Sequence, residues 1–122
     1  MAGEPTSASA DELDRPEPGC CSVGHDLSVD AAAADVDTLA ALGNDTRYEA
    51  LRLIADADSA VCVCELEPAL GVSQGAVSQA LSRLFSAGLV NRRKDGRWRY
   101  YTATPRARRL LDVLDETRNA DA

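Results

Sequence analysis

The chain has 122 residues, 45% of them hydrophobic, which is enough for one small domain and a tail. No apolar run is long enough to cross a membrane, and the first residues lack the basic and apolar regions of a signal peptide, so we expect a cytoplasmic protein. The formal net charge of −7 would argue against a nucleic-acid partner if the charge were evenly spread.

The charge is not evenly spread. Residues 71–110 hold nine basic residues and one acidic residue, whereas the rest of the chain holds four basic and nineteen acidic residues. A concentrated basic segment in an acidic chain is the electrostatic pattern of a protein with a localised anionic partner. The charge pattern therefore allows nucleic-acid binding and assigns it to residues 71–110.

Residues 1–28 are rich in Ala, Ser, Pro, Gly, Asp and Glu and contain almost no large apolar side chains. Such a segment cannot offset the entropy of its own ordering by burial, so we expect a disordered acidic tail, followed by a folded domain over residues 29–118. The tail carries two adjacent cysteines, Cys20 and Cys21, which are either incidental or reactive. His25 follows them, and a lone histidine in a tail is more often solvated than a ligand.

The next two segments have helical periodicity. In the first, from Asp30 to Leu42, the apolar side chains share one face: Ala33, Val36, Leu39, Ala40 and Leu42. In the second, from Thr46 to Ala55, they again gather together: Tyr48, Leu51 and Ile54, with Leu53 beside them. We expect the apolar face of the second helix to lie in the core.

A short helix is predicted from Glu65 to Leu70. Pro68 is an awkward residue for this helix, because it has no backbone N–H to donate at the fourth helical position. We therefore expect the helix to begin later or to bend at that point.

Cys62 and Cys64, with one residue between them, lie just before this helix. If the segment is a strand, both sulfurs project to one side about 7 Å apart, at ~3.3 Å of rise per residue, and one soft ion can draw them together. If it is helical, the two side chains do not face each other and binding has to unwind the turn. The helix N-terminus is also expected to lower the pKa of the Cys64 thiol. Simple packing is the alternative, but two close cysteine pairs in a cytosolic chain favour a soft-metal or redox site.

A longer helix is predicted from Ser73, a suitable N-cap residue, to Phe85. Its expected buried stripe comprises Val77, Leu81, Leu84 and Phe85, and its outward face carries Gln74, Ser78, Gln79, Ser82 and Arg83. The short turn at residues 71–72 joins it to the preceding helix, which predicts a helix-turn-helix. Amide, hydroxyl and guanidinium groups can read base edges in a major groove, although a solvated helix face has a similar composition.

Gly88 is expected to end this helix, and a cationic β-hairpin is predicted to follow. With Asp95 and Gly96 as the two turn residues, the facing pairs are Lys94/Arg97, Arg93/Trp98, Arg92/Arg99 and Val90/Tyr101. Like charges directly opposite each other are destabilising, so we expect phosphate oxygens to lie against this hairpin. A solvated arginine-rich hairpin is the alternative. The hairpin makes the predicted helix-turn-helix a winged one.

A last helix is predicted from Pro105 to Thr117. Its apolar stripe consists of Leu110, Leu111, Val113 and Leu114. A domain this small leaves apolar surface wet as a monomer, so we expect the last helix to pair with the first helix of a second copy as well as with its own core.

The run from about Thr38 to Thr104, somewhat over half of the chain, resembles the ArsR/SmtB family of winged-helix metalloregulatory repressors. The resemblance rests on the segments LGNDTRYEAL (42–51), VCVCEL (61–66), LGVSQ (70–74), SQAL (78–81), AGLV (87–90) and DGRWRYY (95–101). It implies a mainly α fold with a small β-hairpin, and a homodimer that binds an inverted-repeat operator and is released by an inducer. On this reading the candidate DNA-contacting residues are Ser73, Gln74, Gly75, Ser78, Gln79, Ser82, Arg83, Arg92, Arg93, Lys94, Arg97 and Arg99.

In the thiolate-sensing branch of that family, a Cys-x-Cys at the first motif helix supplies two ligands, here Cys62 and Cys64. One type of arsenite sensor has a third cysteine three residues later, where this chain has Glu67. Other members complete the site with cysteines of the N-terminal tail, a role that suits Cys20 and Cys21. Three sulfurs suit arsenite or antimonite, and four suit cadmium, lead or zinc. A second family site requires a histidine on the last helix, which has none here, and this argues against a zinc or nickel sensor of that type.

We therefore expect a transcriptional repressor that leaves its operator when a thiophilic ion binds the cysteine thiolates, orders the tail and displaces the first motif helix. As(III) or Sb(III) is the expected ion, with Cd(II), Pb(II) or Zn(II) as alternatives. A repressor of the same fold that senses thiol oxidation is the alternative function, and a constitutive DNA-binding protein is a third. We do not expect an enzyme, because the sequence has one histidine, no evident catalytic carboxylate pair and no phosphate-binding loop.

Overall fold

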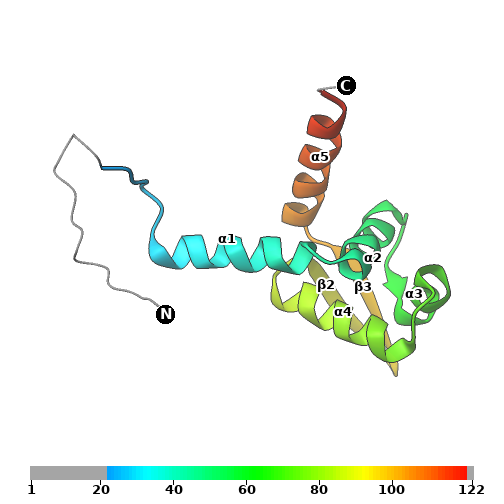
Figure 1. The fold of residues 1–122 in the computed structure, drawn as a ribbon. Coiled ribbons are helices and arrows are strands. Elements are labelled where there is room, and N and C mark those ends of the chain that lie inside the picture. Colours follow the sequence, from blue (N-terminus) through cyan, green and yellow to red (C-terminus); the bar gives the residue numbers. More distant parts are fainter. Residues whose placement is uncertain (1–21, 121–122) are drawn as a thin grey trace.

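The structure, a computed structural model, describes residues 22–120, which form five helices and a three-stranded antiparallel sheet (Figure 1). In chain order the elements are α1 (Val29–Leu42), α2 (Asp45–Asp56), β1 (Val61–Cys62), α3 (Val63–Leu70), α4 (Gln74–Ser86), β2 (Val90–Asp95), β3 (Trp98–Ala103) and α5 (Pro105–Ala120). The prediction of a mainly α winged helix-turn-helix is confirmed. The strand order is β1-β3-β2, so β1 joins the predicted hairpin along β3. Among the described residues, no helix is long and apolar enough to cross a membrane.

The core lies between α2, α3, α4 and the sheet. Leu51 and Ile54 of α2 are buried, as the periodicity predicted. They join the largest buried side chains of the other elements, which are Leu66, Val77, Leu81, Leu84, Leu89 and Val90. The helix-turn-helix formed by α3 and α4 is thereby fixed against α2 on one side and the sheet on the other.

Helix α1 and the end of α5 extend away from this core (Figure 1). Ser28 caps α1, because its hydroxyl accepts a hydrogen bond from the N–H of Ala31 at 3.0 Å. The predicted apolar face of α1 is not covered: Val36 and Leu39 are 64% and 65% exposed. In α5, Leu111 is buried while Val113 and Leu114 remain exposed at 52% and 41%. A single copy of the chain therefore leaves apolar faces of both helices in water.

Helix α3 begins at Val63, so the expectation that Pro68 would delay the helix start beyond Glu65 is wrong. Cys62 is the N-cap residue: its Sγ accepts from the N–H of Cys64 at 3.4 Å, and the Glu65 carboxylate accepts from the N–H of Cys62 at 2.8 Å. This capping box satisfies two backbone donors and stabilises the early start. The Cys62–Cys64 segment is consequently neither a continuous strand nor a helical turn, because it changes from strand to helix at Val63.

The two-residue turn of the hairpin lies one residue later in the chain than predicted, which changes every facing pair. The observed pairs include Asp95 with Trp98, Lys94 with Arg99 and Arg92 with Tyr101. The two turn residues are therefore Gly96 and Arg97 rather than Asp95 and Gly96. Gly96 has φ of +66°, a conformation that glycine adopts without a steric penalty, and it occupies the first central position of the turn. Arg92 consequently faces an aromatic residue, and Lys94/Arg99 is the one directly opposed pair of cations between β2 and β3.

An ion pair connects α5 to α2. Nη2 of Arg52 donates hydrogen bonds to both carboxylate oxygens of Asp115, at 2.8 and 3.1 Å. Arg52 holds the pKa of this carboxyl below its usual value. Since the folded-state pKa is lowered, the pair stabilises the fold above the pKa of the unfolded carboxyl, and this stabilisation is lost as the pH falls through the folded value.

We predict that Asp115→Asn lowers the melting temperature at pH 7 by a few degrees at most, because the pair is partly exposed. The deficit relative to wild type should shrink as the pH falls below the ordinary Asp pKa of about 4 and towards the lowered pKa of the folded Asp115 carboxyl. Thermal melts followed by circular dichroism measure both, with Glu116→Gln on the same helix as the control. A deficit that stays constant down to pH 2.5 would contradict the ionic origin of this contact.

Candidate thiol site and nucleic-acid interface

Helix α4 presents the polar face that the sequence predicted. Ser73 caps it by accepting from the N–H of Ala76 at 3.1 Å. At its other end, Gly88 has φ of +76° and donates to the carbonyl of Phe85, while Leu89 donates to that of Leu84. These two bonds form a Schellman motif. Both helix ends are thus fixed, and the polar side chains exposed along the helix include those of Gln74, Ser78, Gln79 and Ser82.

Two residues of α4 differ from the prediction. Phe85 is not part of the buried stripe, because its side chain is 40% exposed and the Arg92 guanidinium lies 4.1 Å from the centre of its ring. Arg83 is only half-exposed, and its Nη2 lies 3.0 Å from the Asp37 carboxylate of α1. Near the C-terminal end of α4, Arg83 therefore pairs with Asp37 and Phe85 stacks against Arg92. At the start of the helix, Ser73 and Gly75 are exposed.

The cations of the wing, which is the β2–β3 hairpin, are exposed and mostly stacked on aromatic rings. The Arg93 guanidinium lies 5.1 Å from the centre of the Tyr100 ring, and that of Arg97 lies 6.0 Å from the centre of the Trp98 ring. Such stacking holds a guanidinium in place while leaving its N–H groups available. Lys94 and Arg99, paired across the strands, complete this basic edge.

The two described cysteines lie together at the start of α3. Cys62 is 5% exposed and Cys64 is exposed, and both are free thiols. Their sulfurs are 2.8 Å apart, and the Cys64 thiol donates to the sulfur of Cys62. This contact with Cys62 raises the pKa of the Cys64 thiol, and desolvation and the charge of Glu65 act in the same direction. The prediction that this pKa is lowered is therefore wrong, because the contact with Cys62 raises it by more than the backbone hydrogen bond lowers it.

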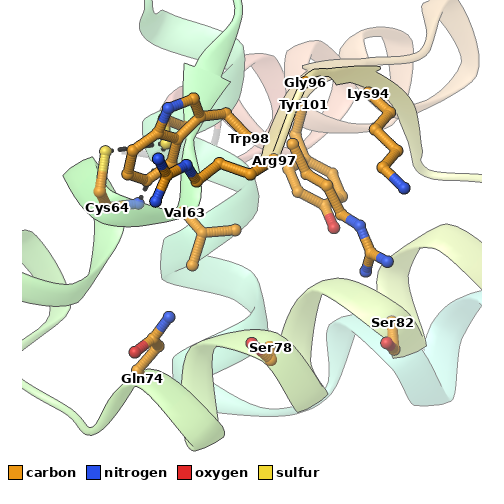
Figure 2. Close-up of a pocket in the computed structure, with 12 residues that line it drawn as sticks. Val63, Cys64, Gln74, Ser78, Ser82, Lys94, Gly96, Arg97, Trp98 and Tyr101 are labelled. Carbon is orange, nitrogen blue, oxygen red and sulfur yellow. Dashed lines mark hydrogen bonds between the residues drawn. The ribbon is translucent and has the colours of Figure 1, made fainter.

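Both cysteines line a cavity of about 430 Å³ between the start of α3, the polar face of α4 and the wing (Figure 2). Gln74, Ser78 and Ser82 line it from α4. The wing contributes Lys94, Gly96, Arg97, Trp98, Arg99 and Tyr101. The structure thus brings the predicted thiol ligands and about half of the predicted DNA-contacting residues to one cavity. Trp98, Val63 and Tyr101 also line the cavity, but the sequence did not predict them as site residues. They lie there because β1 pairs with β3, and the sequence alone does not predict this pairing.

The other two predicted ligands, Cys20 and Cys21, lie outside the described residues. His25, which the sequence indicates is solvated rather than a ligand, is exposed, and its Nδ1 accepts from the N–H of Leu27 at 3.0 Å. Within residues 22–120 no group of three or more His, Cys, Asp or Glu side chains is arranged to hold a metal ion. The donor set at α3 is therefore two thiols, which fits part of a thiophilic site and requires further ligands from elsewhere.

Comparison with known proteins identifies the kind of protein to which this chain is similar. Residues 44–92 match the family described as "Bacterial regulatory protein, arsR family". The chain is 55% identical over 111 residues to a Halobacterium salinarum protein named as an arsenical resistance operon repressor, ArsR2, covering 91% of this chain and 93% of the relative. It is 36% identical over 64 residues to the arsenical resistance operon repressor of Escherichia coli, covering 52% and 54% of the two chains.

Two solved structures of bacterial proteins are similar to this chain in fold. A homodimeric winged helix-turn-helix DNA-binding domain from Mycobacterium bovis aligns with a TM-score of 0.66 at 27% identity, covering 76% of this chain and 88% of that one. HlyU from Vibrio cholerae aligns with a TM-score of 0.64 at 31% identity, covering 74% and 97% of the two chains.

The different environments of the two thiols predict different reactivities. In a Cys20→Ser/Cys21→Ser background, iodoacetamide should alkylate exposed Cys64 at least about tenfold faster than buried Cys62, because alkylation needs an accessible thiolate. The rate at Cys64 should rise with pH through an inflection above the ordinary thiol value, in line with its raised pKa. Mass spectrometry of peptides sampled between pH 6.5 and 10.5 measures both rates. An inflection below pH 8 would contradict the thiol–sulfur contact.

Proposed function

Because the chain belongs to the arsR family of bacterial regulatory proteins, we propose that it is a repressor that binds operator DNA as a homodimer and leaves it when a thiophilic ion binds Cys62 and Cys64. Members of this family are DNA-binding transcriptional regulators, so the prediction that the chain is not an enzyme is confirmed. The observation that carries the proposal is the cavity in which the two thiols meet the polar face of α4 and the wing.

The inducer we propose is As(III) or Sb(III), with Cd(II), Pb(II) or Zn(II) as alternatives. Arsenic(III) in water is a neutral trihydroxide, and each thiol can displace one hydroxyl, forming an As–S bond and releasing water that takes the thiol proton. No oxidant is consumed, and a protonated thiol such as that of Cys64 is a competent reactant. Cys20 or Cys21 would supply the third sulfur of a pyramidal site. The names of the relatives, which are arsenical resistance repressors, support this choice.

The DNA-binding surface we propose consists of the polar face of α4 in the major groove and the wing along the flanking phosphates. Exposure of Gln74, Ser78, Gln79 and Ser82 supports the first contact. The exposed, stacked guanidinium groups of the wing support the second, because phosphate contacts need cations held in place. We propose a smaller role for Arg83, since its guanidinium already pairs with the Asp37 carboxylate. Arg92 stacks on Phe85 in the way that Arg93 and Arg97 stack on their rings, and it keeps its proposed role.

The dimer we propose buries the uncovered apolar faces of α1 and α5. Val36 and Leu39 of α1, and Val113 and Leu114 of α5, are each more than 40% exposed in the single chain. Exposed apolar faces on two helices of one small domain mark an association surface. The homodimeric Mycobacterium bovis neighbour supports a second copy of the same chain as the occupant. Such a repressor works in the cytoplasm, where its operator is.

An alternative function of the same fold is sensing of oxidation by the Cys62–Cys64 pair. The observation in its favour is the 2.8 Å separation of the two sulfurs. Against it stands the raised pKa of Cys64, because oxidants react with the thiolate. Release of operator DNA by peroxide in a metal-free buffer, without any response to thiophilic ions, would favour this alternative.

The direct test of the proposed function is release of operator DNA by thiophilic ions. Reduced, metal-free protein is bound to a labelled fragment of its own promoter and titrated in parallel with arsenite, antimonite, cadmium, lead and zinc. We expect arsenite and antimonite to release the DNA, and Cys64→Ser to require at least about tenfold more of either, because one sulfur ligand is lost. Glu67→Gln on the same helix is the matched control and should respond like wild type. Equal release from Cys64→Ser and wild type would contradict the proposal.

The proposed dimer predicts that Leu39→Glu separates the subunits without unfolding them, because Leu39 is 65% exposed in the single chain. Sedimentation velocity should show a monomer, and operator affinity should fall by at least about tenfold since two half-sites are no longer bound together. Val23→Glu, at a residue that is 99% exposed before α1, is the control and should stay dimeric. A dimeric Leu39→Glu variant would place the interface elsewhere.

We expect substitutions in α4 and in the wing to weaken DNA binding in different ways. Gln79→Ala should weaken binding to the operator by about 1–3 kcal/mol and leave binding to a scrambled duplex unchanged, because an amide reads base edges. Arg99→Ala should weaken both about equally and reduce the slope of log affinity against log salt by about 1, because it contacts phosphate. Fluorescence anisotropy at several salt concentrations measures both effects. The opposite assignment of the two losses would reverse the proposed orientation of α4 and the wing.

A further inference from the structure

The strand that carries Cys62 is paired with the strand that carries Trp98. In the antiparallel register, Val61 faces Tyr101 and Cys62 faces Tyr100. Continued by two residues, this register would bring Cys64 opposite Trp98, but the chain turns into α3 at Val63 and the pairing stops. Cys64 therefore leaves the sheet at the position where β3 begins with Trp98 at the wing tip.

The side chains bear out this placement. Trp98 and Arg97 of the wing tip and Val63 and Cys64 of α3 all line the cavity described above (Figure 2). Trp98 is 49% exposed, so it is not a core residue of the sheet. The wing tip itself is supported by two strands only, because β1 pairs with β3 at Tyr100 and Tyr101 and not beyond. A displacement of Trp98 can therefore move the tip without breaking the core.

Binding of one ion by both thiols requires the sulfurs to move. They now lie 2.8 Å apart. Two sulfurs that share an ion at bonds of ~2.3 Å and angles between 90° and 110° lie roughly 3.3–3.8 Å apart, and the ion itself needs room. Cys62 is buried and held by β1 and by its capping interactions, so the movement falls on exposed Cys64. The space on the exposed side of Cys64 is the cavity that Trp98 and Arg97 line.

We propose that Trp98 is a positioning residue that forms a wall of the thiol site, so that an ion bound by Cys62 and Cys64 displaces the wing tip and its phosphate-binding cations directly. The inference rests on the proposed function and specifies how the thiol site acts on DNA. It adds a route through the wing to the displacement of α3. Lys94 and Arg99 belong to the same hairpin and line the same cavity. This movement would therefore take both cations away from the DNA phosphates.

The fluorescence of Trp98 tests the contact without DNA, because it is the only tryptophan in the chain. Reduced wild-type protein is titrated with arsenite while the emission spectrum and the number of free thiols are followed. We expect the emission to change in intensity and wavelength with the same midpoint as the loss of thiols, and we expect no change in Cys64→Ser. Thiols that are lost with no change in emission would overturn the inference.

Substitution of Trp98 tests the coupling to DNA. Trp98→Leu removes the ring on which Arg97 stacks, so we expect it to bind the promoter fragment more weakly than wild type and to bind arsenite with unchanged stoichiometry. The effect of arsenite is therefore taken relative to each variant's own affinity for the fragment. The factor by which arsenite weakens DNA binding should fall at least about tenfold, since the wall that transmits the movement is smaller. Trp98→Phe, which retains a ring, should recover part of the coupling. The matched control is Asn91→Ala, an exposed wing substitution outside the cavity, which should couple like wild type.

Failure of this inference and failure of the proposed function give different results. If wild-type protein keeps its DNA at saturating concentrations of arsenite, antimonite, cadmium, lead and zinc, the proposed function is wrong and there is no ion-dependent release for Trp98 to affect. If wild type releases its DNA and Trp98→Leu releases it with an equal coupling factor, the function stands and the role of Trp98 is wrong.

Discussion

The two-residue pairing of β1 with β3 is the interaction on which the arrangement of the site depends. It holds the Cys62 backbone beside Tyr100 of β3, the second strand of the wing, and ends where α3 begins. The capping box at Cys62 and Glu65 then turns the chain so that the Cys64 thiol lies against the Cys62 sulfur. One short ladder of hydrogen bonds thus joins the thiols, the first helix of the motif and the wing. We propose that a change in the distance between the sulfurs is transmitted through this ladder to the elements that contact DNA.

The dimer surface and the DNA surface are also connected, through charged contacts. Asp37 of α1 pairs with Arg83 of α4 at 3.0 Å, and Asp35 of α1 lies 3.6 Å from Arg106 of α5. Arg47 of α2 donates to the carbonyl oxygens of Ala40 and Ala41 at the end of α1. Helix α1 is therefore tied to α4 and α5 while its apolar face stays uncovered. In the proposed dimer, these contacts would set the spacing of the two α4 helices.

The features that could be predicted from the sequence are those governed by local signals. Ser73, the stripe of α4 and Gly88 define that helix by capping and periodicity alone, and the observed bounds agree. The hairpin register was missed because Asp95-Gly96 and Gly96-Arg97 both put a glycine in the turn, and pairing with β1 also acts on β3. The raised pKa of Cys64 was missed because it arises from contact with Cys62, which no spacing rule contains. Phe85 is also outside the buried stripe, and Arg92, positioned by that same register, stacks on its ring.

In the proposed mechanism, thiol ligation and operator binding oppose each other within one cavity. The most direct measurement is the affinity of the protein for arsenite when it is free and when it is saturated with its operator, in the same reduced buffer. Because coupling is reciprocal, the account predicts that operator DNA weakens arsenite binding by the same factor by which arsenite weakens DNA binding. An arsenite affinity that is identical in the free and DNA-bound protein would contradict it.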